Sequence, residues 1–259
     1  MNLLKEPTIL SQGIYFQAVI NIKLLDDAII RSNEPEEVLT YSYKAPLNNR
    51  FIIPWRKIKG KLRRFVMEKQ RRLGIMSNCH LKDDLCMQCP SCFMFGGTGE
   101  TSNAKVSYNI LSRVLGETFI STTEVAEIQP YTENAVDEVN LTTGQALMTV
   151  VTVPKETEFI GIATLRDPTL EMISIFVDNL ERLTRLGAST REWGRIKTVI
   201  LGYQISDREN LSAYDLVKEN NIPSDLSKIS GLNLPDANNS YNKLDSDVKK
   251  LLKEHKLIQ

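Results

Sequence analysis

The sequence predicts an α+β fold with a ferredoxin-like core. The prediction depends on the order of the apolar segments, which runs strand, helix, strand, excursion, strand, helix, strand. The helical segments repeat their apolar residues at helical spacing, and the strand segments are rich in β-branched residues. The chain has 259 residues, 42% of them apolar, which is enough for one large core. We therefore expect a single domain over residues 1–259.

The first part of the chain is expected to hold one strand and one basic helix. Residues 14–30 are rich in Val, Ile, Phe and Tyr and alternate in part, so they predict a long strand. A loop insertion is expected over residues 31–53, because this segment begins polar and contains two prolines. Pro54 then begins a helix, since a proline at the first turn loses no hydrogen bond. The apolar face of this helix is predicted to consist of Trp55, Ile58, Leu62, Phe65, Val66 and Leu73.

The rest of the chain alternates strand and helix patterns. Asp167 is predicted to cap the second helix, Pro168 to start it and Gly187 to end it. The tail beyond this core is polar and Asn-rich, and no role is assigned to it. The expected elements are a short strand at 105–111, a β-rich excursion at 117–153, core strands at 159–165 and 195–205, and an extension at 206–259 with a charged helix near 244–256.

Charge is distributed unevenly along the chain. Residues 50–72 contain ten basic residues and one acidic residue, whereas residues 114–154 contain six acidic residues and no Lys or Arg. Basic runs are usually solvated helix faces, but unrelieved like charge destabilises a helix unless a polyanion neutralises it. We therefore favour contact with phosphates. The sequence shows no signal peptide and no run of apolar residues long enough to span a bilayer, so a soluble, cytoplasmic protein without a membrane partner is expected.

The four cysteines lie within fourteen residues, at Cys79, Cys86, Cys89 and Cys92. Clustered thiols in an intracellular chain predict one metal site, here within an insertion at 76–104. Zinc is the first choice of metal, and an iron–sulfur cluster is the alternative. His80 could replace Cys79 as the fourth ligand. Four thiolates close the coordination sphere, so the metal is expected to be structural, and buried thiols without a metal are the remaining alternative.

Two glycine-containing segments could let a backbone approach a nucleic acid. Residues 96–99 read GGTG, and Glu100 follows where a phosphate-binding loop needs Lys and a hydroxyl residue. A tight loop that contacts another chain or a nucleic-acid backbone is therefore expected there. The second segment, 182–195, fits either an ordinary helix end with positive charge or a loop that holds an RNA strand.

Several segments, taken in order over residues 14–205, resemble the RAMP superfamily of CRISPR-associated proteins. Residues 52–63 read IIPWRKIKGKLR, similar to the family's Ile-Pro-Gly-Ser-Ser-Leu-Lys-Gly-x-Leu-Arg helix opening, although its Gly-Ser-Ser is replaced by Trp-Arg-Lys. Residues 89–96 read CPSCFMFG, similar to its Cys-Pro-x-Cys-x-x-Phe-Gly segment. The strand at 153–159 and the turn at 186–195 also resemble the family. The metal loop and the chain length are most similar to the backbone subunit of type I-D effector complexes.

This resemblance implies a modified, RNA-recognition-like ferredoxin core with a β-hairpin thumb at 117–153. It implies copies stacked along CRISPR guide RNA in a helical filament, with other effector subunits, holding complementary target DNA for antiviral interference. We expect the acidic thumb to dock on the basic helix of the next copy. The residues expected to contact RNA are Arg50, Trp55, Arg56, Lys57, Lys59, Lys61, Arg63, Arg64, Gly97, Thr98, Arg191 and Arg195.

Cleavage is the alternative function. RNA-cutting type III relatives place a catalytic Asp between the first strand and the first helix, and this chain has no Asp between Asp27 and Asp83. A non-enzymatic scaffold is therefore expected, and the alternative is a ruler-like nuclease that cuts target RNA or single-stranded DNA at fixed spacing. Its weak metal-binding candidates are Asp26, Glu34, Glu36 and Glu37. A third possibility is a free-standing zinc adaptor for other proteins, which would carry no RNA.

Overall fold

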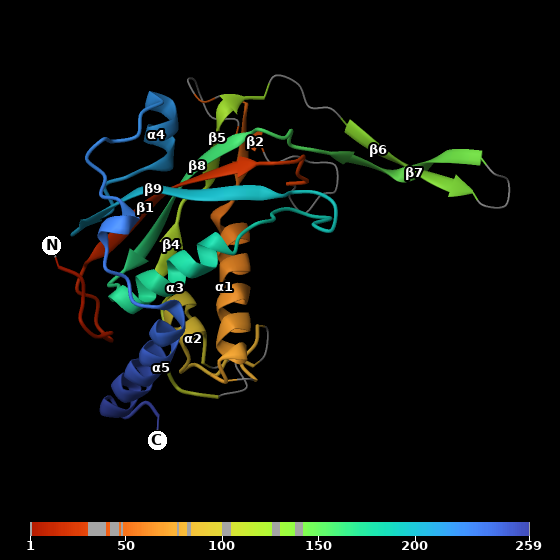
Figure 1. Ribbon diagram of the computed structural model, residues 1–259. Helices are drawn as coiled ribbons and strands as arrows, with labels where there is room; N and C mark the ends of the chain where they lie inside the picture. Colours follow the sequence, from red (N-terminus) through yellow and green to blue (C-terminus); the bar gives the residue numbers. More distant parts are fainter. Residues whose placement is uncertain are drawn as a thin grey trace.

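A computed structural model describes residues 2–30, 40–41, 47, 49–76, 78–81, 84–99, 105–125, 130–137 and 142–258. Figure 1 shows a sheet with helices on both faces and a hairpin that projects from one side. The elements are β1 (Tyr15–Leu24), β2 (Thr40–Tyr41), β3 (Arg50–Ile53), α1 (Trp55–Arg72), α2 (Pro90–Phe95), β4 (Val114–Gly116), β5 (Phe119–Glu124), β6 (Pro130–Asp137), β7 (Thr142–Val151), β8 (Glu158–Arg166), α3 (Leu170–Glu181), β9 (Ile196–Ser206), α4 (Ala213–Glu219), the 3₁₀ turn η1 (Ile229–Gly231) and α5 (Ala237–Glu254).

The main sheet has the predicted ferredoxin-like topology. Its strand order is β2-β3-β5-β8-β1-β9, and β4 also pairs with β8. The pairs β1–β8, β1–β9 and β5–β8 are all antiparallel. β4 and β5 pair with successive parts of β8, so together they occupy the position of one core strand. The core order β1, α1, β4/β5, β8, α3, β9 confirms the predicted α+β class.

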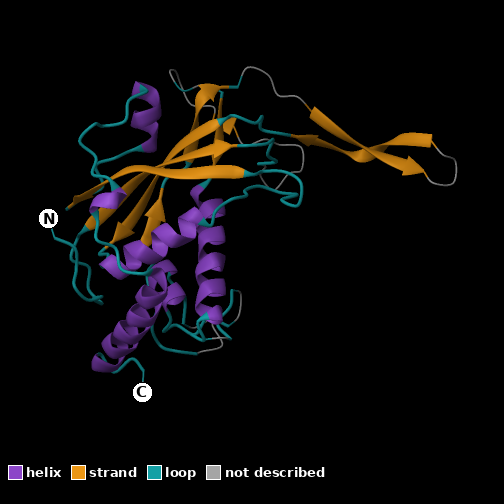
Figure 2. Ribbon diagram, in the orientation of Figure 1, coloured by secondary structure: helices purple, strands orange, loops and turns teal. Residues whose placement is uncertain are grey.

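Most helices lie on one face of the sheet (Figures 1 and 2). Alternate residues of β1 point to that face, where Phe16, Ile20 and Ile22 are fully buried in the main core with residues of α1 and α3. The intervening Val19 points to the other face and packs with Leu216 of α4 in a smaller cluster. α1 and α3 are thus fixed on the sheet by its alternating pattern, and α4 covers part of the opposite face.

The two core helices begin close to their predicted positions. Pro54 precedes α1 with an extended backbone, and Ile58, Leu62 and Val66 are buried on its inner face. Thr169 caps α3 by accepting a hydrogen bond from the backbone N–H of Met172. The predicted cap, Asp167, instead accepts hydrogen bonds from Gln12 N and Ile14 N. None of the described helices is long and apolar enough to cross a membrane.

The projecting hairpin consists of β6 and β7, which pair with each other in a sheet of their own. Residues Phe119–Glu124, at the start of the predicted 117–153 excursion, instead form β5 of the main sheet. Ala28 and Val153 bridge directly after the hairpin and attach its base to the end of β1. The hairpin is therefore shorter than predicted, and its base lies at one edge of the domain.

Other element boundaries also differ from the predictions. β1 ends at Leu24, because the chain bends at residues 25–26. The strand predicted at 105–111 is reduced to a single bridge between Gly97 and Ile110. α5 begins at Ala237, earlier than predicted, because Asp236 accepts a hydrogen bond from Asn239 N and caps it.

Part of the unassigned C-terminal extension belongs to the core. Tyr241 of α5 is fully buried, and its hydroxyl accepts a hydrogen bond from the Asn179 side chain of α3. Leu244, Val248 and Leu252 of α5 are buried in the same core. Residues 237–254 therefore form an integral helix that covers α3.

Candidate functional site

The four predicted cysteine ligands meet at one point. The Sγ atoms of Cys79, Cys86, Cys89 and Cys92 all lie within 4.8 Å of one another. Cys79 Sγ is 3.7 Å from Cys92 Sγ and 3.7 Å from Cys89 Sγ. A tetrahedral ion with metal–sulfur bonds of about 2.3 Å holds its ligands about 3.8 Å apart. The thiols are free, so the donor set and its spacing fit a single metal ion.

Local structure brings the thiols together from two segments. Cys79 follows the turn that ends α1, in which Ile75 N donates to the backbone oxygen of Gln70. Cys89 caps α2, and its Sγ accepts the backbone N–H of Cys92. Cys92 lies on the first turn of α2 behind Pro90, which suits this position because it has no N–H to satisfy. The short Cys-Pro-x-Cys segment therefore positions one pair of sulfurs through ordinary helix capping.

The thiols of the cluster shift one another's pKa in opposite directions: the pKa of Cys79 is lowered, whereas hydrogen bonding with Cys79 raises the pKa of Cys86 and of Cys92. The Cys86, Cys89 and Cys92 thiols lie within hydrogen-bonding distance of Cys79 and lower the pKa of its thiol, and Cys86 contributes most. Three of the thiols are buried, whereas Cys86 is partly exposed. Cys86 also lines a surface hollow of about 350 Å³, which provides a route from solvent. His80 lies apart from this group, since its Nε2 is 3.3 Å from Asp84 Oδ2 and its side chain is 57% exposed.

A groove runs along the other side of α1, between this helix and the loop that follows α3. Its cavity volume is about 550 Å³. On the α1 side, Arg56, Lys57, Lys61 and Arg64 line it. The remaining described residues that line it are Ile29, Ile30, Gly60, Leu186, Gly187, Ala188 and Thr190. None of these lining residues is acidic, so the groove is lined by four cations, of which Lys61 also donates to the backbone oxygen of Arg185.

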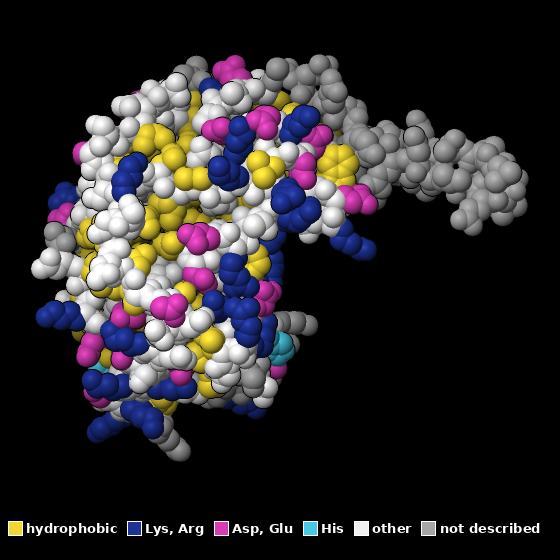
Figure 3. Space-filling view, viewed as in Figure 1, with side chains coloured by type: hydrophobic (Ala, Val, Ile, Leu, Met, Phe, Trp, Pro, Cys, Tyr) yellow, Lys and Arg dark blue, Asp and Glu magenta, His cyan; other side chains and the backbone are white. Residues whose placement is uncertain are grey.

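The cations in the groove crowd one another. Burial lowers the pKa of Lys61, and the charges of Arg64 and Arg185 lower it further. Among the described residues, Arg56, Lys57 and Arg64 take part in no ion pair. Figure 3 shows Lys and Arg side chains gathered below the projecting hairpin. A polyanion in the groove would relieve this repulsion.

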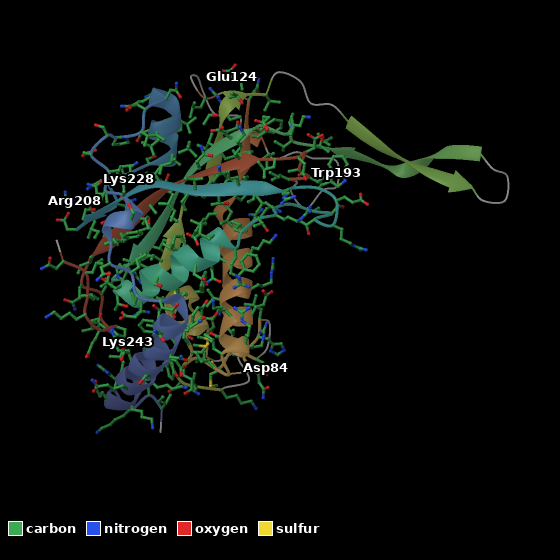
Figure 4. All side chains as sticks on the ribbon, in the orientation of Figure 1. Asp84, Glu124, Trp193, Arg208, Lys228 and Lys243 are labelled. Carbon is green, nitrogen blue, oxygen red and sulfur yellow. The ribbon has the colours of Figure 1, made fainter. Side chains whose placement is uncertain are left out.

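Backbone bonds between distant segments hold the loop of the groove in place. Ala188 N donates to Ile29 O, and Gly194 N donates to Asp27 O. The Asp26 carboxylate accepts Arg195 N at 2.6 Å, and the Asp27 carboxylate accepts Lys155 N at 2.8 Å. The end of β1 is thereby attached to both the loop and the base of the hairpin. Trp193 of this loop lies beside the hairpin base, and Asp84 of the cysteine loop lies near the opposite end of α1 (Figure 4).

The sequence from residue 42 to residue 258 matches the family model described as Csc2 Crispr. The chain belongs to this family. The resemblance to CRISPR-associated proteins is thus confirmed at the level of the family, and the type I-D backbone role stays a prediction.

Solved structures share the fold of this Csc2 Crispr family member. The crystal structure of Csc2 from Thermofilum pendens has a TM-score of 0.58 and 20% identity, covering 100% of this chain and 82% of that chain. A chain of a type IV-B CRISPR complex has a TM-score of 0.52 and 14% identity, covering 76% of this chain and 93% of that chain. At these identities the likeness shows the fold alone. A search of curated proteins found no match.

The predicted RNA contacts on α1 divide into two stripes. Arg56, Lys57, Lys61 and Arg64 line the groove. Lys59 and Arg63 face the opposite side, where Lys59 Nζ donates to Ser112 Oγ at 2.9 Å and Arg63 Nη2 donates to Gly96 O at 2.8 Å. Helical spacing separates the stripes, because residues 59 and 63 are four apart and share a face. The sequence showed that the helix is basic, and the packing of neighbouring loops decides which cations reach the groove.

The remaining predicted RNA contacts lie in several places. Arg50 donates to Thr122 O and lies 3.9 Å from Glu124, so it is engaged within the sheet. The Trp55 ring stacks with Phe119, with 6.4 Å between ring centroids. Gly97 bridges to Ile110 beside the cysteine loop, and Thr98 follows it. Arg191 and Arg195 are exposed on the loop that borders the groove.

The described residues do not bring the nuclease candidates together in one site. Glu34, Glu36 and Glu37 lie outside the residues that the structure describes. The Asp26 carboxylate is engaged with the backbone of Arg195. This bond gives Asp26 a role in holding the loop of the groove.

Sequence reasoning missed two contributors to these sites. Gly60 lies in the middle of α1 and lines the groove, and a Cβ added there would meet nothing within 4 Å. A glycine inside a strongly basic helix could have indicated a contact surface at that position, because glycine weakens a helix interior. Gln70 is fully buried and contacts the cysteine cluster. Its signal is a polar side chain on the buried face of an amphipathic helix.

Proposed function

We propose that this chain is an RNA-binding subunit of a CRISPR effector complex and that the groove beside α1 holds the guide RNA. The observation that carries the proposal is a groove with four cations and no acidic residue among its described lining. A phosphate backbone provides repeated negative charge at a spacing that such a groove can follow, and its binding releases counterions. Contacts of this kind position RNA without reading its sequence, as a guide of variable sequence requires.

The architecture also suits a subunit that stacks along the guide. The β6–β7 hairpin projects beside the groove, and its base is attached to the segment that holds the loop of the groove. We infer that the hairpin of one copy reaches the next copy, with the acidic residues of its 130–151 sequence supplying negative charge to basic residues there. The copies would form the backbone of a type I-D interference complex and help hold target DNA. Membership of the Csc2 Crispr family supports this inference.

We further propose that the four cysteines hold a structural zinc ion. Four thiolates at tetrahedral spacing leave no coordination position for water, so the ion would stabilise the loop and would not catalyse a reaction. Ligands of an iron–sulfur cluster bind different iron atoms and lie further apart than ligands of one ion. The 3.7 Å separations between Cys79 Sγ and the sulfurs of Cys89 and Cys92 therefore favour zinc.

The RNA proposal is tested with the variant Arg56→Ala/Arg64→Ala. Each arginine lost from a phosphate contact should make the negative slope of log K against log salt shallower by about 0.7. The slope of the double variant should therefore be shallower by about 1.4. The matched control is Lys253→Ala/Lys256→Ala, which removes two exposed cations from the end of α5 and the turn that follows it. Binding of a single-stranded RNA is measured by fluorescence anisotropy at several salt concentrations. The control should keep the slope of the unaltered protein.

Equal slopes for the groove variant and the control would contradict binding in this groove. A protein that carries no nucleic acid from the cell and binds no RNA would instead support the zinc-adaptor alternative. Metal content is measured on the same samples, so failure of the RNA proposal leaves the metal proposal separately testable.

A further inference from the structure

Gln70 places a buried amide between α1 and the cysteine cluster. Its side chain is fully buried. Its Nε2 donates to Cys89 Sγ at 3.3 Å, and its Oε1 accepts the backbone N–H of Ser91 at 3.3 Å. Both ends of the amide are therefore used on the same short segment of chain.

A glutamine at this position needs an explanation. The buried neighbours on α1 are apolar and include Ile58, Leu62, Val66 and Met67. Burying an amide costs free energy unless its polar atoms find partners, and an apolar residue of similar size would pack without that cost. Here the donor is aimed at a sulfur of the candidate metal site.

The chemistry of a four-thiolate site gives this donor a use. Four thiolates around one divalent ion carry a net charge of about −2, which is costly to bury without nearby donors. Backbone N–H groups supply part of the need, since Cys86 N lies 3.5 Å from Cys79 Sγ and Cys92 N lies 3.5 Å from Cys89 Sγ. Among the described residues, Gln70 is the one whose side-chain amide donates to a cysteine sulfur.

We propose that Gln70 is a positioning residue of the metal centre, which stabilises Cys89 as a thiolate and fixes its orientation. This inference depends on the proposed metal centre. Donors to the ligands of a metal commonly change its affinity by about ten-fold to a hundred-fold.

The same contacts attach the metal loop to the helix that forms the groove. Gln70 donates to Cys89 Sγ, and Arg71 Nη1 donates to Cys79 O at 3.2 Å, both from the last turn of α1. The groove cations lie on another side of the same helix. The metal centre therefore supports the helix at its C-terminal end, remote from the loop of the groove.

The test uses Gln70→Met in the full-length chain, loaded with Co²⁺ or Zn²⁺. Methionine keeps the length of the side chain but removes the N–H donor. Without the donor, the sulfur electrons are less stabilised, so the sulfur-to-cobalt charge-transfer band should move to lower energy. Zinc release to a competing chelator should become at least about ten-fold faster.

Two further variants make the result specific. Asn179→Leu removes a different fully buried amide, which bonds Tyr241 and Ile175 O on α3. It should reduce stability without moving the cobalt band. If Gln70→Met does not fold, Gln70→Asn serves instead, since its amide is one methylene too short to reach both partners and should give the same band shift.

The outcomes separate the two proposals. A cobalt band and zinc release rate that are unchanged in a folded Gln70 variant would overturn the role of Gln70 and leave the metal centre intact. A protein that takes up neither Co²⁺ nor Zn²⁺ would overturn the metal centre itself. A band shift of equal size in Asn179→Leu would show general loosening of the fold and would also overturn the role of Gln70.

Discussion

At the scale of single residues, two glycines set the path of the loop that borders the groove. Gly187 has φ +98° and Gly194 has φ +76°, a region that other residues rarely adopt. A Cβ on Gly194 would lie 1.9 Å from Leu186 O, and one on Gly187 would lie 2.6 Å from Ile29 O. The loop therefore approaches itself at Gly194 and the segment after β1 at Gly187 more closely than a side chain allows.

We expect Gly194→Ala to lower the free energy of unfolding by at least about 2 kcal/mol, because it combines left-handed strain with a backbone clash. RNA affinity should fall as well, since Leu186, which lines the groove, must shift to relieve the clash. Urea denaturation and RNA titration measure the two effects. Gly231→Ala is the control, because no atom lies within 4 Å of the added Cβ. A Gly194 variant as stable as this control would contradict the assigned strain.

At the scale of elements, the cysteine loop connects α1, which ends at Arg72, to the short helix α2, which begins at Pro90. α2 has six residues, too few to be stable as an isolated helix. Cys89 and Cys92 hold its first turn, and all of its residues are buried. A metal ion at this point would therefore contribute directly to the folding of the segment.

We expect removal of zinc by a strong chelator to lower the melting temperature, and Cys89→Ser to reproduce that loss. Zinc at about 1,000 times its Kd stabilises a protein by about 4 kcal/mol through mass action. Calorimetry with and without chelator, together with metal analysis, measures the effect. The chelator should leave the melting temperature of Cys89→Ser unchanged. Equal melting temperatures of the unaltered protein with and without chelator would contradict a structural metal.

At the scale of the whole molecule, the hairpin is separate from the core. Among the described strands, β6 and β7 pair only with each other. An isolated bridge between Ala28 and Val153 joins the two chain segments at the base of the hairpin. The projecting hairpin is therefore available for contact with another molecule, and Val151 at the end of β7 packs against the main core.

Replacing residues 131–150 with a short Gly-Ser linker keeps Val151 on the core. It should leave the core folded, with a free energy of unfolding within about 0.5 kcal/mol of the original. Binding of one copy to a short RNA should persist, because the groove is intact. Assembly of several copies on a long RNA should be lost. Analytical ultracentrifugation with RNAs of two lengths measures both. Assembly that is unchanged without the hairpin would contradict its role between copies.

Local patterns in the sequence were sufficient for the fold class and the ligand set. Runs of apolar and β-branched residues, alternating in part over residues 14–30, predicted β1 and β8. Helical spacing predicted α1 and α3, because that period follows directly from backbone geometry. The Cys-Pro-x-Cys spacing predicted the metal cluster, since a short segment fixes the distance between its own sulfurs. The excess of positive charge on α1 was equally visible in the sequence.

These patterns could not predict contacts between distant segments. The helical period places Lys59 and Lys61 on different sides of α1, but only tertiary packing decides that Lys59 contacts Ser112 while Lys61 lines the groove. The assignment of Phe119–Glu124 to the main sheet likewise depends on pairing with β3 and β8. Sequence by itself determined the core strands β1 and β8, the core helices α1 and α3, the cysteine cluster and the charge of α1. Tertiary structure decided which cations share an open groove, because that depends on segments more than a hundred residues away, such as Ala188 and Gly187.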